Sequence, residues 1–383
     1  MRMRGVFWGA ACAVAAWCAG GVAPLRLERV ADYPLGVEGA SGITYAGGAR
    51  FYVVRDHAPE MGGEAALHAL DLDFDERTGE IRSQKLGPGV ALRGNRDSEG
   101  VAFDPATGAV WVSDEEAATV RAFDLAGKPL GREVAMPAIQ RAQMVPNRSL
   151  EALGLFGDVL WTANEEALRC DGALSSPSAG TVVRLMRFTR RGAGDAWRLA
   201  GTWPYVCARG APAFGPSQTG LSGLCALPDG SLLALEREVS VATWGRCEIY
   251  RVPPASFARA TDVTGVPALT NAVWTGLAKG PPLVSFAGGR PDAVIAYEGI
   301  CLGPTLADGA RVVCLVSDGG EARCFGLRVH LAARLCVLRL FGLPSSSAAA
   351  PPPSPQGTAG GDFSQPAFSA VCGILSADLQ GEP

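Results

Sequence analysis

Short apolar runs separated by turn residues make up most of this chain. Five segments share one arrangement, in which a small or acidic lead-in is followed by an apolar run, a turn, a second apolar run and an acidic end. The turns include "DPATG", "PDG" and "ADG", whose residues supply the positive φ angles that tight hairpins need. Each segment therefore predicts a β-hairpin. The five segments are residues 40–57, 97–116, 149–166, 220–238 and 297–319.

The predicted hairpins recur at intervals that indicate a repeated structural unit. Gly42, Gly100, Ala152, Gly223 and Gly299 occupy equivalent points, at intervals of 58, 52, 71 and 76 residues. A β-propeller blade has four strands in about 40 to 50 residues plus loops, so each interval has room for one blade. Runs such as "ALHALDLDFD" and "TVVRLMRFTR" follow the hairpins and predict third strands. The sequence therefore predicts an all-β propeller with five or six blades.

The two ends of the chain differ from the repeated region. Residues 1–23 have two arginines, an apolar run and small residues, which is the layout of a signal peptide; a retained N-terminal anchor is the alternative. Residues 24–343 predict one β domain with almost no helix. Within it, the last apolar run, 335–340, is expected to share a blade with the first stretch, 25–35. Residues 344–383 are rich in Pro, Ala, Ser and Gly and predict a disordered tail.

Composition narrows the class of partner. The chain has 383 residues, of which 48% are hydrophobic, and its net charge is −4 with no run of Lys or Arg. Nothing in this balance favours nucleic acid or an anionic membrane surface. With the expected signal peptide removed, we predict a secreted or periplasmic protein without a membrane span. Its expected partner is a small molecule, and the sequence leaves its oligomeric state open.

Nine of the 11 cysteines lie outside the expected signal peptide, and none forms a CxxC pair, so a zinc knuckle is not predicted. In an exported protein some of them are expected to form disulfides, and the odd number leaves at least one unpaired. Cys170 and Cys207 flank the same arginine-rich strand region and are the pair that we expect. Cys225 and Cys314 stand inside apolar runs and fit core positions.

Acidic residues mark both ends of the predicted hairpins. In an antiparallel hairpin, the residue before the first strand and the residue after the second lie at the same end. Because the first strand of each blade lines the central channel, these ends are expected to converge around the channel mouth. The expected pairs are Glu99 with Glu115, Glu151 with Glu165, Glu298 with Asp318, Asp56 with Glu38 or Ser41, and Glu236 with Ser222.

Carboxylates packed this closely repel one another and raise one another's pKa. Three arrangements would relieve the repulsion: a hard cation, with Ca²⁺ the best match to many oxygen ligands; an intervening arginine; or carboxyls that stay protonated and act as general acid or base. The structural alternative is that the acids cap turns or connect blades. We assign candidate catalytic roles to Glu99, Glu151, Glu236, Glu298 and Arg237, substrate binding to Arg55 and His57, and metal binding to Asp56, Asp97, Glu115, Glu165 and Asp318.

Other chemistries have little support in the sequence. The chain has three histidines and no GxSxG, GxGxxG or P-loop motif. A serine triad, a histidine-based metal site and a nucleotide-binding loop are therefore not predicted.

Taken together, the repeats resemble the phytase-like family, described as "esterase-like activity of phytase" proteins. The resemblance runs from about Leu25 to Leu340 through "DSEGVAFD", "SLEAL", "LSGLCALPDGSLLALERE" and "YEGICLGPTLADG". It implies a propeller-type domain whose recurrent acids hydrolyse phosphoesters. This chain has Gly223 where members often have an aspartate. By position, the family's residues fall on Asp97, Glu99, Glu115, Glu151, Glu165, Glu236, Arg237 and Glu298.

The main hypothesis is an exported hydrolase that acts on phosphoesters, or on other anionic small molecules, at a Ca²⁺-binding channel mouth. Two alternatives stay open. The first is a non-catalytic secreted propeller that binds a ligand or a surface partner and holds structural calcium. The second is a metal-dependent lactonase or esterase on the same fold.

Overall fold

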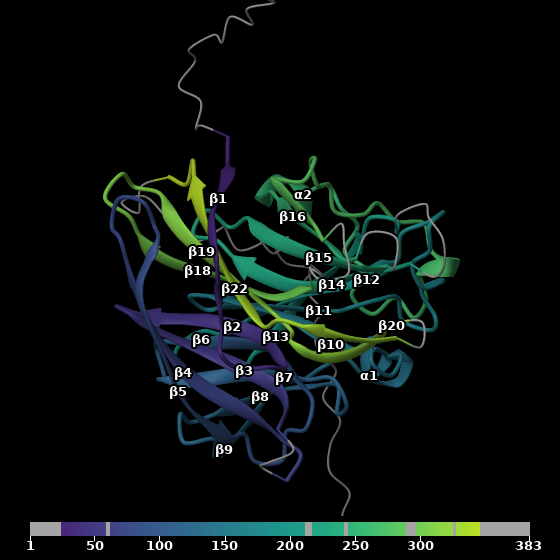
Figure 1. The fold of residues 1–383 in the computed structure, drawn as a ribbon. Coiled ribbons are helices and arrows are strands. Elements are labelled where there is room, and N and C mark those ends of the chain that lie inside the picture. Colours follow the sequence, from purple (N-terminus) through teal and green to yellow (C-terminus); the bar gives the residue numbers. More distant parts are fainter. Residues whose placement is uncertain are drawn as a thin grey trace, which may run out of the picture. The chain divides into compact units, whose positions relative to one another are not determined.

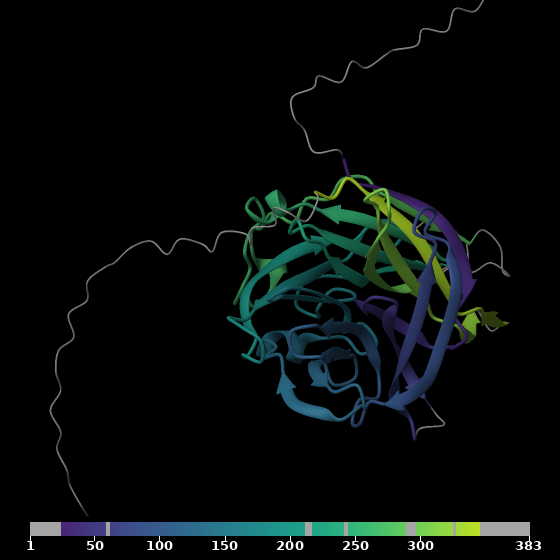
Figure 2. The same ribbon diagram turned by 90° about the vertical axis from the view of Figure 1, so that its left-hand side faces the viewer.

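The computed structural model describes residues 24–344 except 59–61, 211–216, 241–243, 289–295 and 325–326. Five four-stranded antiparallel sheets in these residues form a five-bladed β-propeller (Figure 1). Figure 2 shows the sheets following one another around a common axis in the order of the sequence colours. The predicted fold class is confirmed, and the number of blades is five.

Each blade is built from strands that are consecutive or nearly consecutive in the chain. The first contains β2 (Ala40–Gly47), β3 (Arg50–Ala58), β4 (Glu64–Phe74) and β5 (Ile81–Ala91), and the second β6 (Ser98–Asp104), β7 (Ala109–Asp114), β8 (Thr119–Phe123) and β9 (Pro129–Glu133). The third contains β10 (Leu150–Phe156), β11 (Val159–Asn164), β12 (Val182–Thr189) and β13 (Arg198–Val206). The fourth contains β14 (Ser217–Ala226), β15 (Leu232–Ser240), β16 (Arg246–Val252) and β17 (Val284–Ala287).

The fifth blade joins the two ends of the domain. It contains β18 (Tyr297–Thr305), β19 (Arg311–Ser317), β22 (Arg334–Phe341) and β1 (Arg26–Pro34), in that order from the channel outward. β1 and β22 pair antiparallel from Arg26 opposite Phe341 to Pro34 opposite Arg334, and they lie side by side in Figure 1. The expected sharing of a blade by the terminal strands is confirmed, and this pairing closes the ring.

Outside the blades, the described chain contains few regular elements. β20 (Gly320–Cys324) and β21 (Leu327–Leu331) form a separate hairpin. The helices are short: α1 (Ala138–Gln143), α2 (Pro254–Phe257) and the 3₁₀ turn η2 (Leu269–Asn271). None of these helices is long and apolar enough to cross a membrane. The expected signal peptide and, apart from Pro344, the expected tail lie outside the described residues.

The apolar core lies between neighbouring blades. Five clusters of buried side chains each draw on two adjacent sheets, as when Phe51 and Val53 of the first blade pack with Val312 and Val337 of the fifth. Every blade is therefore buried on both faces, which explains why the second and third strands are nearly continuous apolar runs. The propeller is stabilised mainly by burial of these faces.

The recurrent glycines let the inner strands approach one another. A Cβ on Gly100 of β6 would lie 2.6 Å from the carbonyl oxygen of Glu151 on β10. A Cβ on Gly299 of β18 would lie 2.8 Å from Cα of Gly42 on β2. No side chain fits at these points. The inner strands therefore converge at the level of these glycines, and the glutamates that directly precede Gly100 and Gly299 are brought close together.

The expected disulfide between Cys170 and Cys207 is not present, because both cysteines are free. Cys207 is buried in the core between the third and fourth blades. Cys170 packs against the core between the second and third blades. The two residues flank the same strands in the sequence, but they face opposite sides of the third blade. Cys225 and Cys314 occupy core positions, as expected.

Candidate functional site

Each of the five inner strands has a β-bulge at the same level. The register of β10 on β11 passes from Leu150 to Ala152, so Glu151 has no direct partner. β18 shows the same shift around Glu298, and β6 shows it around Glu99 and Gly100. In β2 and β14 the residue at the shift is a serine, Ser41 or Ser222. Bulges redirect side chains next to functional sites, and here they place three glutamates on the channel.

The second strands contribute another ring of residues at the same level. In each second strand, one residue pairs with the residue that precedes the bulge of the inner strand. From the first blade to the fifth, the residue that follows this partner is Asp56, Glu115, Glu165, Arg237 and Asp318. Four of these five residues are acidic. The channel mouth is therefore lined by two rings, one from the bulges of the inner strands and one from the second strands.

Five of these residues form a continuous group that we call the acid cluster: Asp97, Glu99, Glu115, Glu151 and Glu165. It consists of two sets that share Glu115, and within each set one carboxylate oxygen per residue lies within 4.8 Å of the others. One set is Asp97, Glu99 and Glu115, and the other is Glu115, Glu151 and Glu165.

Two contacts within the acid cluster matter for its chemistry. Oε1 of Glu115 accepts the backbone N–H of Ser149 at 2.7 Å, which fixes this carboxylate between the two sets. Oε2 of Glu151 is buried and accepts no hydrogen bond from any described residue. A buried carboxylate oxygen without a donor is costly, so the position of Glu151 favours a cationic ligand.

Arg237 of β15 connects three blades at the edge of the acid cluster. Its guanidinium donates to Oε1 of Glu165 at 3.0 Å and to Oε1 of Glu151 at 3.3 Å, and it also pairs with Glu298. The side chain is 15% exposed. Although burial opposes it, the carboxylates of Glu298, Glu151 and Glu165 hold the pKa of Arg237 well above its ordinary value. Arg237 and Arg148, which pairs with Glu165, therefore face a larger number of potential negative charges.

The shortage of positive charge appears in the pKa values of the acids. Burial raises the pKa of Glu115 to about 7; Asp97 and Glu165 raise it further, while the N–H of Ser149 and Arg237 lower it. Burial likewise raises the pKa of Glu298 to about 8, against the lowering effect of Arg237. The pKa values of Glu99 and Glu151 are raised well above their ordinary range, mainly by burial and then by neighbouring carboxylates. In the absence of a cation, these groups therefore retain protons near neutral pH.

Two aspartates extend the ring beyond the acid cluster. Asp56 accepts the backbone N–H of His57 at 2.6 Å, and burial raises its pKa to about 6, with further contributions from Asp318 and Asp97. Burial also raises the pKa of Asp318, although Arg237 and the N–H of Gly319 lower it. Both aspartates therefore share the electrostatic field of the acid cluster without belonging to either close set.

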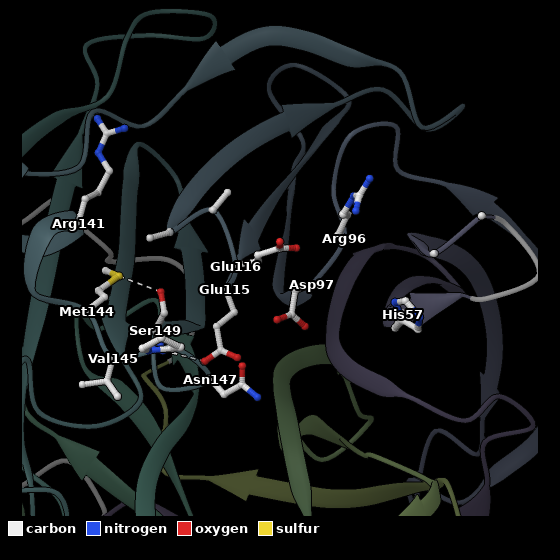
Figure 3. A pocket seen from close by; sticks show the side chains of 15 residues that line it. His57, Arg96, Asp97, Glu115, Glu116, Arg141, Met144, Val145, Asn147 and Ser149 are labelled. Atoms are coloured by element: carbon white, nitrogen blue, oxygen red, sulfur yellow. Dashed lines mark hydrogen bonds between the residues drawn. The ribbon is translucent and has the colours of Figure 1, made fainter.

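A cavity of about 900 Å³ opens above the acid cluster. Asp97 and Glu115 reach it, and in Figure 3 their carboxylates point into the same space. Arg96 and Arg141 also line the cavity, but both side chains extend away from these carboxylates (Figure 3). His57 forms part of another wall. The cavity thus combines an acidic floor with arginines at a distance from it.

The backbone around the cavity is strained at two points. Ala118 and Asn147 both line the cavity and adopt left-handed φ angles of 52° and 53°. Asparagine tolerates this region better than other non-glycine residues, whereas alanine does not. Such strain is often found at functional sites, where the surrounding structure enforces it.

The sequence comparison identifies the family. The model of the phytase-like family, described as "Esterase-like activity of phytase", matches residues 35–319. This chain belongs to the phytase-like family. The match contains every acid of the two rings described above, and the suspected family relationship is confirmed.

Other comparisons add little about this phytase-like protein. No curated protein matches it. Among solved structures, the α-L-arabinofuranosidase PaAbf62A from Podospora anserina is similar at 10% identity and a TM-score of 0.38, over 82% of this chain and 95% of that one. The periplasmic gluconolactonase PpgL from Pseudomonas aeruginosa is similar at 15% identity and a TM-score of 0.33, over 80% and 89% of the two chains. Similarities of this size support no inference about substrate.

The structure places most of the predicted site residues of this phytase-like protein together, but it separates Glu236 from them. The register pairs Leu221 with Glu236, so the position equivalent to Glu115 and Glu165 is Arg237, one residue later. Successive residues of a strand point to opposite faces. The carboxylate of Glu236 accordingly accepts the N–H of Ala208 at 2.7 Å, together with the Tyr205 hydroxyl and the ammonium of Lys279.

The strand register also places two other residues, Arg55 and Ser222. Arg55 occupies the register position of Glu236 in the first blade, and it is not among the residues that line the cavity. In the fourth blade, the residue equivalent to Glu151 is Ser222 and not Gly223. A Cβ on Gly223 would lie 2.7 Å from the carbonyl oxygen of Glu298, so an acidic side chain has no room there.

Sequence reasoning missed the part of the cavity that lies before the third blade. Arg141, Asn147 and Ser149 come from α1 and the segment that follows it. Arg148, between the last two, pairs with Glu165 at 3.4 Å and with Glu166 at 3.1 Å. The available signal was the sequence "NRSLEAL", in which polar residues directly precede an inner strand.

Proposed function

We propose that this phytase-like protein is a metal-dependent hydrolase that acts on phosphoesters at the acid cluster. One observation carries the proposal. Two sets of carboxylates share Glu115, and Asp97 and Glu115 of these sets line an open cavity, while a buried oxygen of Glu151 in the same cluster has no hydrogen-bond donor among the described residues. Membership of a family named for an esterase-like activity is consistent with a hydrolase.

The acid cluster fits a hard divalent cation. All of its ligand atoms are carboxylate oxygens, which suit Ca²⁺, Mg²⁺ or Mn²⁺ and not soft metals. Ca²⁺ accepts the largest number of oxygen ligands and the least regular geometry, so it is our first candidate. Asp97, Glu99 and Glu115 would hold a cation on one side, and Glu115, Glu151 and Glu165 on the other. Burial, and then the carboxylates of Asp97 and Glu165, raise the pKa of Glu115, and a bound cation would offset both effects.

The chain's own residues have separate roles in the proposed reaction. A bound cation supplies polarisation of a phosphoryl oxygen and a lower pKa for water. Glu298, whose pKa lies near 8, can give or take a proton close to neutral pH. Arg237 holds Glu298, Glu151 and Glu165 in fixed positions. Arg96 and Arg141 line the cavity, where they would contact anionic groups of the substrate remote from the reacting phosphate.

The cellular location is part of the proposal. The layout of residues 1–23 supports export and cleavage near the start of the β domain, with residues 344–383 as a disordered tail. N-terminal sequencing of the protein recovered from its native host tests this proposal. A mature protein that begins between residues 19 and 25 supports export, whereas an intact residue 1 contradicts it.

The decisive experiment combines metal removal with a matched pair of variants. We expect hydrolysis of p-nitrophenyl phosphate or a polyphosphorylated sugar alcohol to stop in excess EDTA and to return with Ca²⁺. Glu115→Gln should abolish this activity, because it removes one charge from both sets. Glu76→Gln, at an exposed glutamate in the turn after β4, should leave it unchanged. Undiminished turnover in EDTA contradicts the proposal, and stabilisation by Ca²⁺ without any turnover favours a non-catalytic propeller.

A second candidate, an esterase or lactonase that acts on carbon substrates, is favoured by a different observation. Arg237 is paired with three carboxylates and Arg148 with Glu165 and Glu166, so the arginines in contact with the acid cluster are already paired with acids. An uncharged ester would not need an unpaired arginine. Parallel assays with phosphoesters and lactones separate the two candidates, because both activities would depend on the metal but only one class of substrate would turn over.

A further inference from the structure

Two cysteines face each other across the first two strands of the fifth blade. Cys301 of β18 is paired directly with Cys314 of β19 in the antiparallel register. Both are free, both are buried, and both belong to the apolar core between the first and fifth blades, so their side chains lie on the same face. Their thiols are close enough to interact directly.

This arrangement matches the geometry of a cross-strand disulfide. Directly opposite residues of an antiparallel pair have Cα atoms about 4.5 to 5.5 Å apart. Disulfides join residues whose Cα atoms are about 4.4 to 6.8 Å apart. The bond therefore needs rotation of two side chains and no movement of the strands.

We propose that Cys301 and Cys314 form a structural disulfide between β18 and β19. Nothing in this proposal depends on the hydrolase activity, because the pair lies toward the opposite end of the channel from the acid cluster. Cys301 follows Glu298 along β18, and it lines a second cavity of about 230 Å³ that is surrounded by the later residues of all five inner strands.

The bond forms by thiol–disulfide exchange in two steps, shown here with Cys301 as the first nucleophile. The Cys301 thiolate attacks one sulfur of a disulfide oxidant such as oxidised glutathione and releases the first thiolate. The Cys314 thiolate then attacks the Cys301 sulfur and releases the second. Two protein thiols are oxidised to one disulfide, the oxidant is reduced to two thiols, and the two protons from the protein end on these thiols.

The other described cysteines do not offer an equivalent pair. Cys225 lines the same cavity as Cys301, but it lies on β14 of the neighbouring blade, where its register partner is Leu233. Cys336 of β22 is paired with Leu315. The thiol of Cys247 accepts the backbone N–H of Tyr297 at 3.3 Å. The register thus selects Cys301 and Cys314, and Cys225 is the natural control because it is equally buried nearby.

The expected consequence is a stronger fifth blade. This blade is the one that closes the ring through the pairing of β1 with β22, and the bond would fix its inner strand to its second strand. Burial raises the pKa of the Cys301 thiol well above its ordinary value, so exchange in the folded protein should be slow. We therefore expect the disulfide to form while the chain folds.

The test uses the full chain refolded from urea, either in a mixture of oxidised and reduced glutathione or in dithiothreitol. Free thiols are then alkylated, and the protein is digested with trypsin, which cuts after Arg311 and so separates the two cysteines. After oxidative refolding, we expect a cross-linked pair of peptides that contains Cys301 and Cys314. The oxidised protein should also melt about 5 °C above the reduced protein, as for a disulfide that closes a short loop in a large domain.

Three variants make the result specific. Cys225→Ala should keep the cross-link and the difference in melting temperature. Cys314→Ala and Cys314→Val should lose both, with Cys301 alkylated in each. Alkylation of both Cys301 and Cys314 in the oxidatively refolded wild type overturns the proposal, as does a cross-link from Cys301 to Cys225. Because two replacements of different size are compared, a packing defect at residue 314 is distinguished from loss of the bond.

Discussion

Glu115 offers the sharpest test of the electrostatics of the channel mouth. It is the residue shared by both carboxylate sets, and it is 8% exposed. Glutamine has nearly the same shape, and its carbonyl oxygen can still accept the N–H of Ser149. Its amide group can donate to neighbouring carboxylates. Glu115→Gln therefore removes a charge and a titration while it leaves the packing almost unchanged.

The expected size of the effect follows from the pKa of Glu115. Its rise from an ordinary value near 4.5 to about 7 corresponds to about 3 kcal/mol of folding free energy. Between these two pH values the folded protein binds more protons than the unfolded chain. The contribution of Glu115 to the free energy of unfolding is therefore fully present below pH 4.5 and is lost as the pH rises through 7. In the glutamine variant, this particular loss does not occur.

The assay is urea or thermal unfolding of metal-free protein in EDTA at pH 5 and pH 8. At pH 8 we expect Glu115→Gln to be more stable than the wild type by up to about 3 kcal/mol, or about 5 °C in melting temperature. At pH 5 the two proteins should differ little. Saturating Ca²⁺ should reverse the order at pH 8, because the wild type retains the full ligand set.

One result would refute this reasoning. Suppose that Glu115→Gln is less stable than the wild type at pH 8 in EDTA. The ionised carboxylate of Glu115 then stabilises the metal-free fold, which is the opposite of what a raised pKa requires. Glu76→Gln is again the matched control, and its stability relative to the wild type should be the same at both pH values.

Three other substitutions test separate parts of the structure. Arg237→Met removes the cation between Glu151, Glu165 and Glu298, and should destabilise the metal-free protein by about 3 kcal/mol or more at pH 8. The loss should be smaller at pH 5, because the raised pKa values of Glu151 and Glu298 let these two carboxyls take up protons. Urea unfolding at both pH values measures this, and an equal loss at both would contradict the charge argument. Glu236→Gln should destabilise the protein by about 3 kcal/mol, because it leaves Lys279 without its charged partner. Calorimetry should nevertheless show an unchanged affinity for Ca²⁺. Weaker Ca²⁺ binding would instead show that Glu236 belongs to the metal site. Ala118→Gly should stabilise the fold by about 1 kcal/mol by relieving a left-handed φ of 52°, and a destabilised variant in urea unfolding would show that this residue is not strained.

The local sequence determined the elements of this fold. Turn residues and apolar runs defined the five hairpins, because hairpin formation depends on φ angles and side-chain alternation within a few residues. The "EG" pairs at residues 99–100 and 298–299 marked the points of closest approach between inner strands. The apolar runs near the two ends of the domain indicated the shared fifth blade. All of these signals are contained in short stretches of chain.

The tertiary structure decided which of the acidic residues meet. The bulges in the inner strands shift the register by one residue, and this shift places Arg237 and not Glu236 at the channel mouth. It equally decided that Cys170 and Cys207 face different cores while Cys301 and Cys314 face each other. The cavity depends on α1 and the segment after it, which come from between two blades. These outcomes depend on register and on packing between blades, which bring together residues far apart in the sequence, and no local pattern encodes such distances.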